Sequence, residues 1–128
     1  MPPRWPDIEL VVGTWLRASL PTARVVTKLP ATLETAMPLV WVARGPGSDD
    51  GITDSPLVDV AAFAATRAGM WQLAEDARQA MHELAGKVVA GDLVDTVDTA
   101  VGPVWLDYEN DAVNRAVASY RLALRRSF

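Results

Sequence analysis

Three aspartates lie close together in the segment GPGSDDGITDSP, residues 45–56, between two strongly apolar stretches. Asp49, Asp50 and Asp54 carry the oxygen ligands that hard divalent cations prefer, so a metal site is the first chemistry to consider. An EF-hand loop needs acids at alternate positions, then a glycine and a distant glutamate. Here two acids are adjacent, Gly51 comes too early and no glutamate closes the loop. The segment therefore favours a solvated hairpin loop with side-chain-to-backbone turns, and we expect no metal there.

A second series of acids, Asp92, Asp95 and Asp98, recurs at every third residue. On a β-strand this spacing sends alternate side chains to opposite faces, so the three carboxylates cannot converge on one ion. We expect them to mark a solvated strand edge.

The chain has one histidine, His82, and no cysteine. A zinc site or a catalytic triad would need His82, but no second histidine or cysteine completes a ligand set, and no G-x-S-x-G elbow supplies a nucleophile. The glycines form neither a P-loop nor a G-x-G-x-x-G pattern. The sequence therefore predicts a surface histidine, no catalytic residues, no cofactor and a protein that is not an enzyme.

Composition indicates one globular domain over residues 1–128, with 50% hydrophobic and 22% charged residues. The net charge of −4 argues against a dedicated nucleic-acid binder, but it suits a protein past which DNA slides. The N-terminal prolines and acids do not form a signal peptide, and no apolar run approaches the ~18 residues of a membrane span. We expect no membrane association.

Apolar residues at helical spacing predict two helices. The first has Pro6 as its first residue and ends near Ser19, because Pro21 disfavours helical geometry just before it. The second spans residues 66–91, with Thr66 as its N-cap and its end at Gly86 or Gly91. Its apolar stripe comprises Met70, Leu73, Ala74, Ala77, Ala80, Met81 and Leu84.

Five strands are predicted, at residues 23–29, 38–44, 56–65, 92–108 (with a break at Gly102-Pro103) and 112–126. A helix over 112–126 stays open as an alternative, although the alternation there fits a strand better. On that strand one face is apolar and the other carries Arg115, Arg121 and Arg125. The order α-β-β-β-α-β-β predicts an α+β fold, with two helices packed on a mostly antiparallel or mixed sheet.

Two sets of residues have alternative roles. Trp15, Trp41 and Trp71 are expected in the core, whereas Trp5 and Trp105 lie near element ends and could serve an interface. The arginine row Arg115, Arg121 and Arg125 is either a solvated strand face or a charge-complementary subunit interface.

The ordered segments resemble the tail terminator proteins of long, non-contractile-tailed bacteriophages, particularly those of actinobacterial phages. The likeness rests on three stretches: WPDIELVVGTWLR leading to ARVVTKLP, then PLVWVARGPGSDDGITDSPLVDVAAFAATRAGMWQLAEDAR, and last VGPVWLDYENDAVNRAVASYRLALR. It covers almost the whole chain, and its strength lies in the order and spacing of all three stretches.

The resemblance implies a structural virion protein at the neck end of the tail, assembled in the host bacterial cytoplasm. Tail terminators form a homohexameric ring on the finished tail tube and stop tube polymerisation. They then present a surface to the head-tail connector or head-closure protein. The partners implied are other copies of the chain, the major tail tube protein and the connector. Genomic double-stranded DNA would pass through the ring without specific binding.

Two interfaces follow from that resemblance as hypotheses. The loop residues Ser48, Asp49, Asp50, Thr53 and Asp54 would face the lumen or the tube, where acidic groups repel DNA phosphates. The arginine row would lie at or near the subunit seam of the ring, because a cyclic ring joins unlike faces.

Two alternatives stay open from the sequence. One is another neck protein of the same virion, a head-tail adaptor or a head-closure protein. The other is a small ligand-binding or enzymatic α+β domain, which would need a pocket with convergent polar groups.

Overall fold

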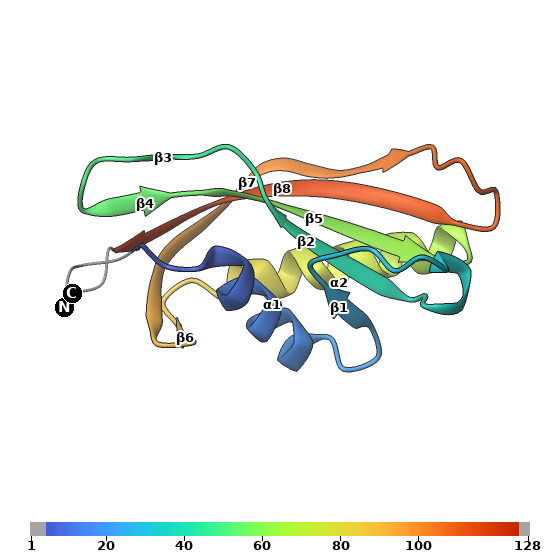
Figure 1. Cartoon of the computed structure of the whole chain (residues 1–128), viewed down its shortest axis with the longest axis horizontal. Coiled ribbons are helices and arrows are strands. Elements are labelled where there is room, and N and C mark those ends of the chain that lie inside the picture. Colours follow the sequence, from blue (N-terminus) through green and yellow to red (C-terminus); the bar gives the residue numbers. More distant parts are fainter. Residues whose placement is uncertain (1–4, 126–128) are drawn as a thin grey trace.

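A computed structural model describes residues 5–125 and confirms the α+β class, with two helices on one side of a curled mixed sheet (Figure 1). The helices are α1 (Ile8–Ser19), α2 (Arg67–Glu83) and the short 3-10 helix η1 (Leu33–Thr35). The strands are β1 (Arg24–Val26), β2 (Leu39–Arg44), β3 (Ser48–Asp49), β4 (Thr53–Ser55), β5 (Leu57–Ala64), β6 (Val88–Val89), β7 (Asp92–Leu106) and β8 (Asn114–Arg125).

The sheet is organised around β8. Strands β1, β2, β5 and β8 follow one another across the sheet, and β7 pairs with β8. Within residues 5–125, β1 and β2 pair in parallel and the other strand pairs are antiparallel. In the described chain β1 and β7 therefore lie at opposite sides of the central sheet.

The aspartate-rich segment is more ordered than a solvated loop. Strand β3 pairs with β4, and β4 pairs with the end of β8 through Thr53 opposite Arg125. Between β4 and β5 the Pro56 carbonyl still accepts a hydrogen bond from the Leu122 N–H, at 3.1 Å. The segment is thus the outer part of one long β2–β5 hairpin, and it extends beyond the helices in Figure 1. We call residues 48–54 the hairpin tip.

Gly47 permits the two arms of this hairpin to approach closely. A Cβ atom at this position would lie 2.7 Å from the Pro56 Cα and 2.8 Å from the Ser55 carbonyl oxygen. Both neighbours are backbone atoms, which move only with the strand itself. A side chain at position 47 would therefore push the arms apart.

Two apolar clusters cover the two faces of the sheet. The main core lies between the sheet and both helices, and it contains the whole predicted stripe of α2. A smaller cluster on the opposite face includes Leu33, Leu39 and Phe63, under the connection that holds η1. The two covered faces explain why β2 is apolar on both sides. Trp15 and Trp71 pack against the main core and Trp41 against the smaller cluster, as expected.

The helix ends differ in detail from the prediction. Asp7 is the N-cap of α1 and its carboxylate accepts the Leu10 N–H, so Pro6 precedes the helix and is not its first residue. Thr66 caps α2 as predicted, and its Oγ1 accepts the Gly69 N–H. Helix α2 ends at Glu83, shortly before Gly86, which has a positive φ of 82°. The alternative end at Gly91 is wrong, because β6 lies between the helix and that glycine.

The strands beyond α2 are longer than expected. The predicted break at Gly102-Pro103 is wrong, since β7 continues through it with irregular register between Val101 and Val104. That irregularity leaves Gly102 and Pro103 without a partner on β8, so the missing proline N–H costs no ladder bond. The strand predicted over 112–126 is β8, which excludes the helical alternative; residue 126 lies outside the described residues.

Candidate interaction surfaces

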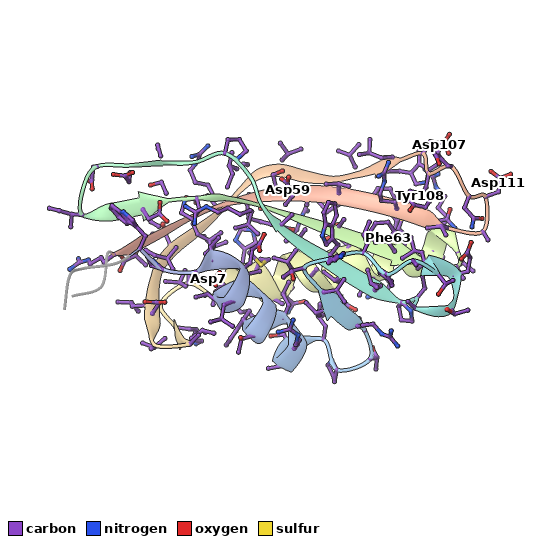
Figure 2. The ribbon with its side chains drawn as sticks, in the orientation of Figure 1. Asp7, Asp59, Phe63, Asp107, Tyr108 and Asp111 are labelled. Carbon is purple, nitrogen blue, oxygen red and sulfur yellow. The ribbon has the colours of Figure 1, made fainter. Side chains whose placement is uncertain are left out.

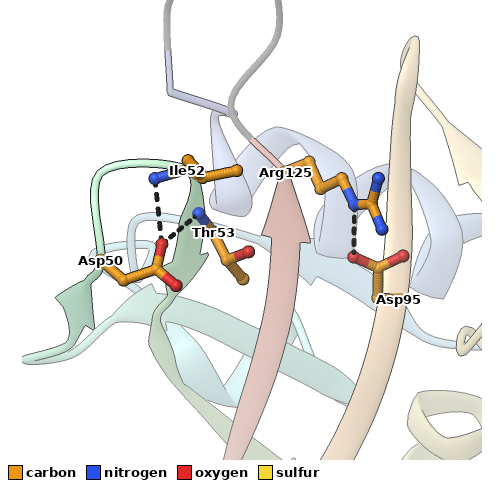
Figure 3. Close-up of polar contacts among 5 residues, drawn as sticks. All are labelled: Asp50, Ile52, Thr53, Asp95 and Arg125. Atoms are coloured by element: carbon orange, nitrogen blue, oxygen red, sulfur yellow. Dashed lines mark hydrogen bonds and ion pairs between the residues drawn. The ribbon is translucent and has the colours of Figure 1, made fainter.

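The carboxylates at the hairpin tip bind their own backbone (Figure 3). Asp50 Oδ1 accepts hydrogen bonds from the Ile52 N–H at 2.9 Å and the Thr53 N–H at 2.7 Å. Asp49 Oδ1 accepts the Gly51 N–H at 3.0 Å. These bonds confirm the predicted side-chain-to-backbone turns, and they fix the shape of the tip from within.

The same bonds set the protonation of Asp50. The N–H of Thr53 and then that of Ile52 hold the pKa of the Asp50 carboxyl below its ordinary value, because both donors favour the charged form. The tip therefore carries a fixed negative charge on an exposed turn. Ser48 is exposed beside it and Thr53 is partly buried.

Asp54 differs from the other acids of the tip because it points inward. Asp54 is only 5% exposed, and its Oδ2 lies 3.3 Å from the Arg44 guanidinium. Asp54 is one of the five residues predicted to form a contact surface, but its carboxylate pairs with Arg44 inside the hairpin. The sequence alone could not show this, since Arg44 lies on the other arm of the hairpin.

The three arginines of β8 occupy different environments along the strand. Arg125 Nε lies 3.6 Å from Asp95 Oδ2 on β7 (Figure 3), and Arg115 donates a hydrogen bond to the Asp107 carbonyl at 2.7 Å. The Arg115 guanidinium also lies over the Tyr108 ring, which packs edge-on against Phe63 at the β7–β8 turn (Figure 2). Arg121 is exposed and has no ion pair within residues 5–125.

A polar cluster joins the wet face of α2 to β7. The exposed His82 makes a 2.7 Å hydrogen bond between its Nε2 and Thr99 Oγ1, and its ring lies edge-on to Tyr120. Burial raises the pKa of the Tyr120 hydroxyl, and the nearby positive charge of Arg78 opposes part of that rise. The Tyr120 hydroxyl has no hydrogen-bond partner among the described residues. His82 is thus a surface histidine, as predicted, that ties two elements together.

The second half of β7 forms an apolar surface that the sequence analysis did not identify, apart from Trp105. Its exposed apolar residues are between 37% and 52% exposed, and they are Val101, Val104, Trp105 and Leu106. We call residues 98–106 the β7 edge. The run VGPVWL is its signal in the sequence, although the Gly-Pro pair within the run predicts a break in the strand.

The structure offers little that resembles a catalytic or metal site. Within residues 5–125 no three His, Asp or Glu side chains gather as metal ligands.

Of the series Asp92, Asp95 and Asp98, the first is buried, so the predicted solvated edge is wrong for that residue. A hollow of about 400 Å³ lies between residues 21–24 and 35–38, and Arg24 is its one charged residue. No helix of the described chain is long and apolar enough to cross a membrane.

One comparison with known proteins shows the family, and another shows the fold. The family described as "Phage tail termination protein" matches residues 4–111. A chain of a solved structure entitled "Virion of native gene transfer agent (GTA) particle" superposes with a TM-score of 0.62 at 15% identity, over 92% of this chain and 94% of that chain. That degree of identity bears on the fold alone. No curated protein sequence matches the chain. On the family match, which covers most of its length, this chain belongs to the phage tail termination protein family and is a structural protein of the phage tail.

Proposed function

We propose that this chain acts as the tail terminator itself: copies of it close into a ring on the finished tail tube and stop its polymerisation. The ring, a hexamer in this proposal, then offers a surface to the head-tail connector and lets the double-stranded genome pass through. Assembly takes place in the host cytoplasm before the tail joins the head. The observation that carries the proposal is the family match over residues 4–111.

The hairpin tip is the proposed contact with the lumen or the tube. Ser48, Asp49, Asp50 and the exposed Ile52 are available on it, whereas Asp54 holds the hairpin from within. Carboxylates bound to their own backbone keep their position without a partner, and they repel passing phosphates. This supports a tip that guides DNA and does not retain it.

The arginine row is proposed to lie beside the subunit seam. Arg121 is the member best suited to reach another copy, because Arg115 and Arg125 already contact Asp107 and Asp95. Charge reversal of Arg121 should then weaken ring formation at moderate salt. Rings that form equally well with the reversed charge would remove Arg121 from the seam.

A tube-growth assay tests the function. The cognate major tail tube protein is polymerised with and without this chain, and tube lengths and ends are scored by negative-stain imaging. We expect arrested growth and extra density at one end of each tube. Unchanged lengths and bare ends would contradict the proposal, and density only on isolated connectors would indicate a neck adaptor instead.

A further inference from the structure

The β7 edge has an open side. Strand β6 pairs only with Asp92 and Leu93, and the turn before β6 reaches no further than Val94. From Asp95 to Leu106 the described chain pairs β7 with β8 alone, so one side of this strand offers unpaired backbone groups. An open strand that also exposes a valine- and tryptophan-rich run is a site where another chain associates.

Contacts from α2 hold this edge in place. The Arg67 guanidinium lies 4.9 Å from the centre of the Trp105 ring. The Arg78 guanidinium lies against Gly102, where a Cβ would come within 2.5 Å of its Nη2. Together with the His82–Thr99 hydrogen bond, these contacts fix the β7 edge along its length. A surface held in advance loses little conformational freedom on binding.

Two sequence segments at opposite sides of the sheet differ in charge. Residues 88–114 contain six carboxylates and no lysine or arginine, whereas residues 10–33 contain three cationic groups and no carboxylate. The first segment carries the β7 edge and the second carries β1. We call the exposed cations of the second segment, Arg17, Arg24 and Lys28, the β1 side.

Asp98 is the one carboxylate of the β7 edge, which Arg67 and Arg78 contact from α2. Asp98 on the β7 edge has no ion pair in the described part of the chain, although Arg121 lies opposite it on β8. Near the β1 side, Glu9 accepts the Arg44 N–H and Asp7 caps α1. Asp76 and Glu83 of α2 lie beside Pro21 and Thr22, and their carboxylates accept hydrogen bonds from glutamine side chains of the same helix.

We propose that the β7 edge of one copy docks against the β1 side of the next copy. This contact covers the exposed valines and the tryptophan, and it brings Asp98 toward Arg24 and Lys28. Because the two surfaces are unlike and lie at opposite sides of the sheet, repetition of the contact runs head to tail, which is the arrangement that a ring requires. The inference rests on the proposed function, since it assigns the seam of the proposed ring.

Cross-linking tests this seam, because the chain has no cysteine of its own. The double variant Ala100→Cys with Thr27→Cys places one thiol on the β7 edge and one next to the β1 side, at two exposed positions. A short, flexible bis-maleimide then joins neighbouring copies over several possible registers. It is added to the protein bound at tube ends, and the products are separated under denaturing conditions. Each single-cysteine variant is the matched control.

We expect the double variant to give a ladder of linked copies that stops at the size of the ring, and each single variant to stay monomeric. Linked dimers formed by the Ala100→Cys single variant would mean that like surfaces meet, which overturns the proposal. Capped tubes without any ladder would also overturn this seam, while leaving the terminator function in place. Tubes that bind none of the variants or the parent chain would contradict the function itself.

Discussion

The hairpin tip and the β7 edge are both exposed strand segments. They differ in how many of their polar groups have a partner inside the molecule. At the tip the carboxylates of Asp49 and Asp50 accept backbone N–H groups, and Asp54 pairs with Arg44. At the β7 edge the apolar side chains are exposed, and one side of the backbone has no partner strand within the described chain. A cluster of charged residues is easily noticed in a sequence. An exposed apolar strand with unpaired backbone groups is the better indicator of association.

Substituting Val104→Arg should produce the largest effect, because it replaces an apolar contact of the proposed seam with a positive charge that faces the cations of the β1 side. We expect ring formation to weaken by about 2 kcal/mol or more, roughly thirtyfold, while the free energy of unfolding of the monomer changes by less than about 0.5 kcal/mol. Mass photometry with tail tubes measures the first quantity and urea unfolding the second.

The matched control is Ile52→Arg, which adds the same charge at a more exposed apolar residue of the hairpin tip. Ring formation between free copies should tolerate it. If Ile52→Arg disrupts the ring and Val104→Arg does not, the roles of the two regions are reversed.

Gly47→Ala tests the rigidity of the hairpin. The added methyl group would collide with the backbone of Ser55 and Pro56, so we expect a loss of about 1–3 kcal/mol of unfolding free energy. Gly13→Ala is the control: its Cβ would make ordinary contacts with the Arg17 side chain, and it should stabilise α1 by about 0.5–1 kcal/mol. Equal effects of the two changes would show that the close approach at Gly47 is not required.

Tyr120 predicts a loss of stability at alkaline pH. Its pKa is raised by burial, so folding favours the neutral hydroxyl. The stabilisation is complete below the unfolded pKa of about 10 and is lost as the pH rises through the raised folded value. Tyr120→Phe should unfold less readily above that pH and differ by under about 1 kcal/mol at pH 7. Thermal melts against pH measure this, with Tyr108→Phe as the control at the more exposed tyrosine; identical alkaline profiles of parent and Tyr120→Phe would contradict it.

Asp50 predicts a smaller effect at acid pH. Its pKa is lowered by two backbone N–H groups, so its contribution is present above the unfolded value of about 4 and is lost as the pH falls through the lowered folded value. Asp50→Asn keeps an acceptor oxygen but no longer titrates. The Ile52 and Thr53 amide signals should then lose their acid titration in NMR spectra, and a titration that persists in this variant would assign it to another group.

Local patterns predicted the parts of the fold that local physics determines. The helical period gave the buried stripe of α2, and strand alternation gave the two faces of β8, since both follow from neighbouring residues. The inward turn of Asp54 could not be predicted in this way, because it depends on Arg44 across the hairpin. The continuity of β7 through Pro103 likewise depends on an irregular register against β8.

The proposed interaction surfaces show the same difference between features set by neighbouring residues and features set by the fold. A turn at Asp49 and Asp50 follows from residue types, so the sequence predicted it correctly. The apolar character of the β7 edge is visible in the sequence, but its exposure depends on which strands lie beside it. Only the pairing order shows that β1 and β7 lie on opposite sides of the sheet.

A cryo-electron microscopy structure of capped tail tubes would test the central claim most directly. We expect a ring at one end of the tube in which the β7 edge of each copy contacts Arg24 and Lys28 of the next, with the hairpin tips facing the lumen or the tube. A ring whose β7 edges face solvent, with the hairpin tips on the outer wall, would contradict both assignments.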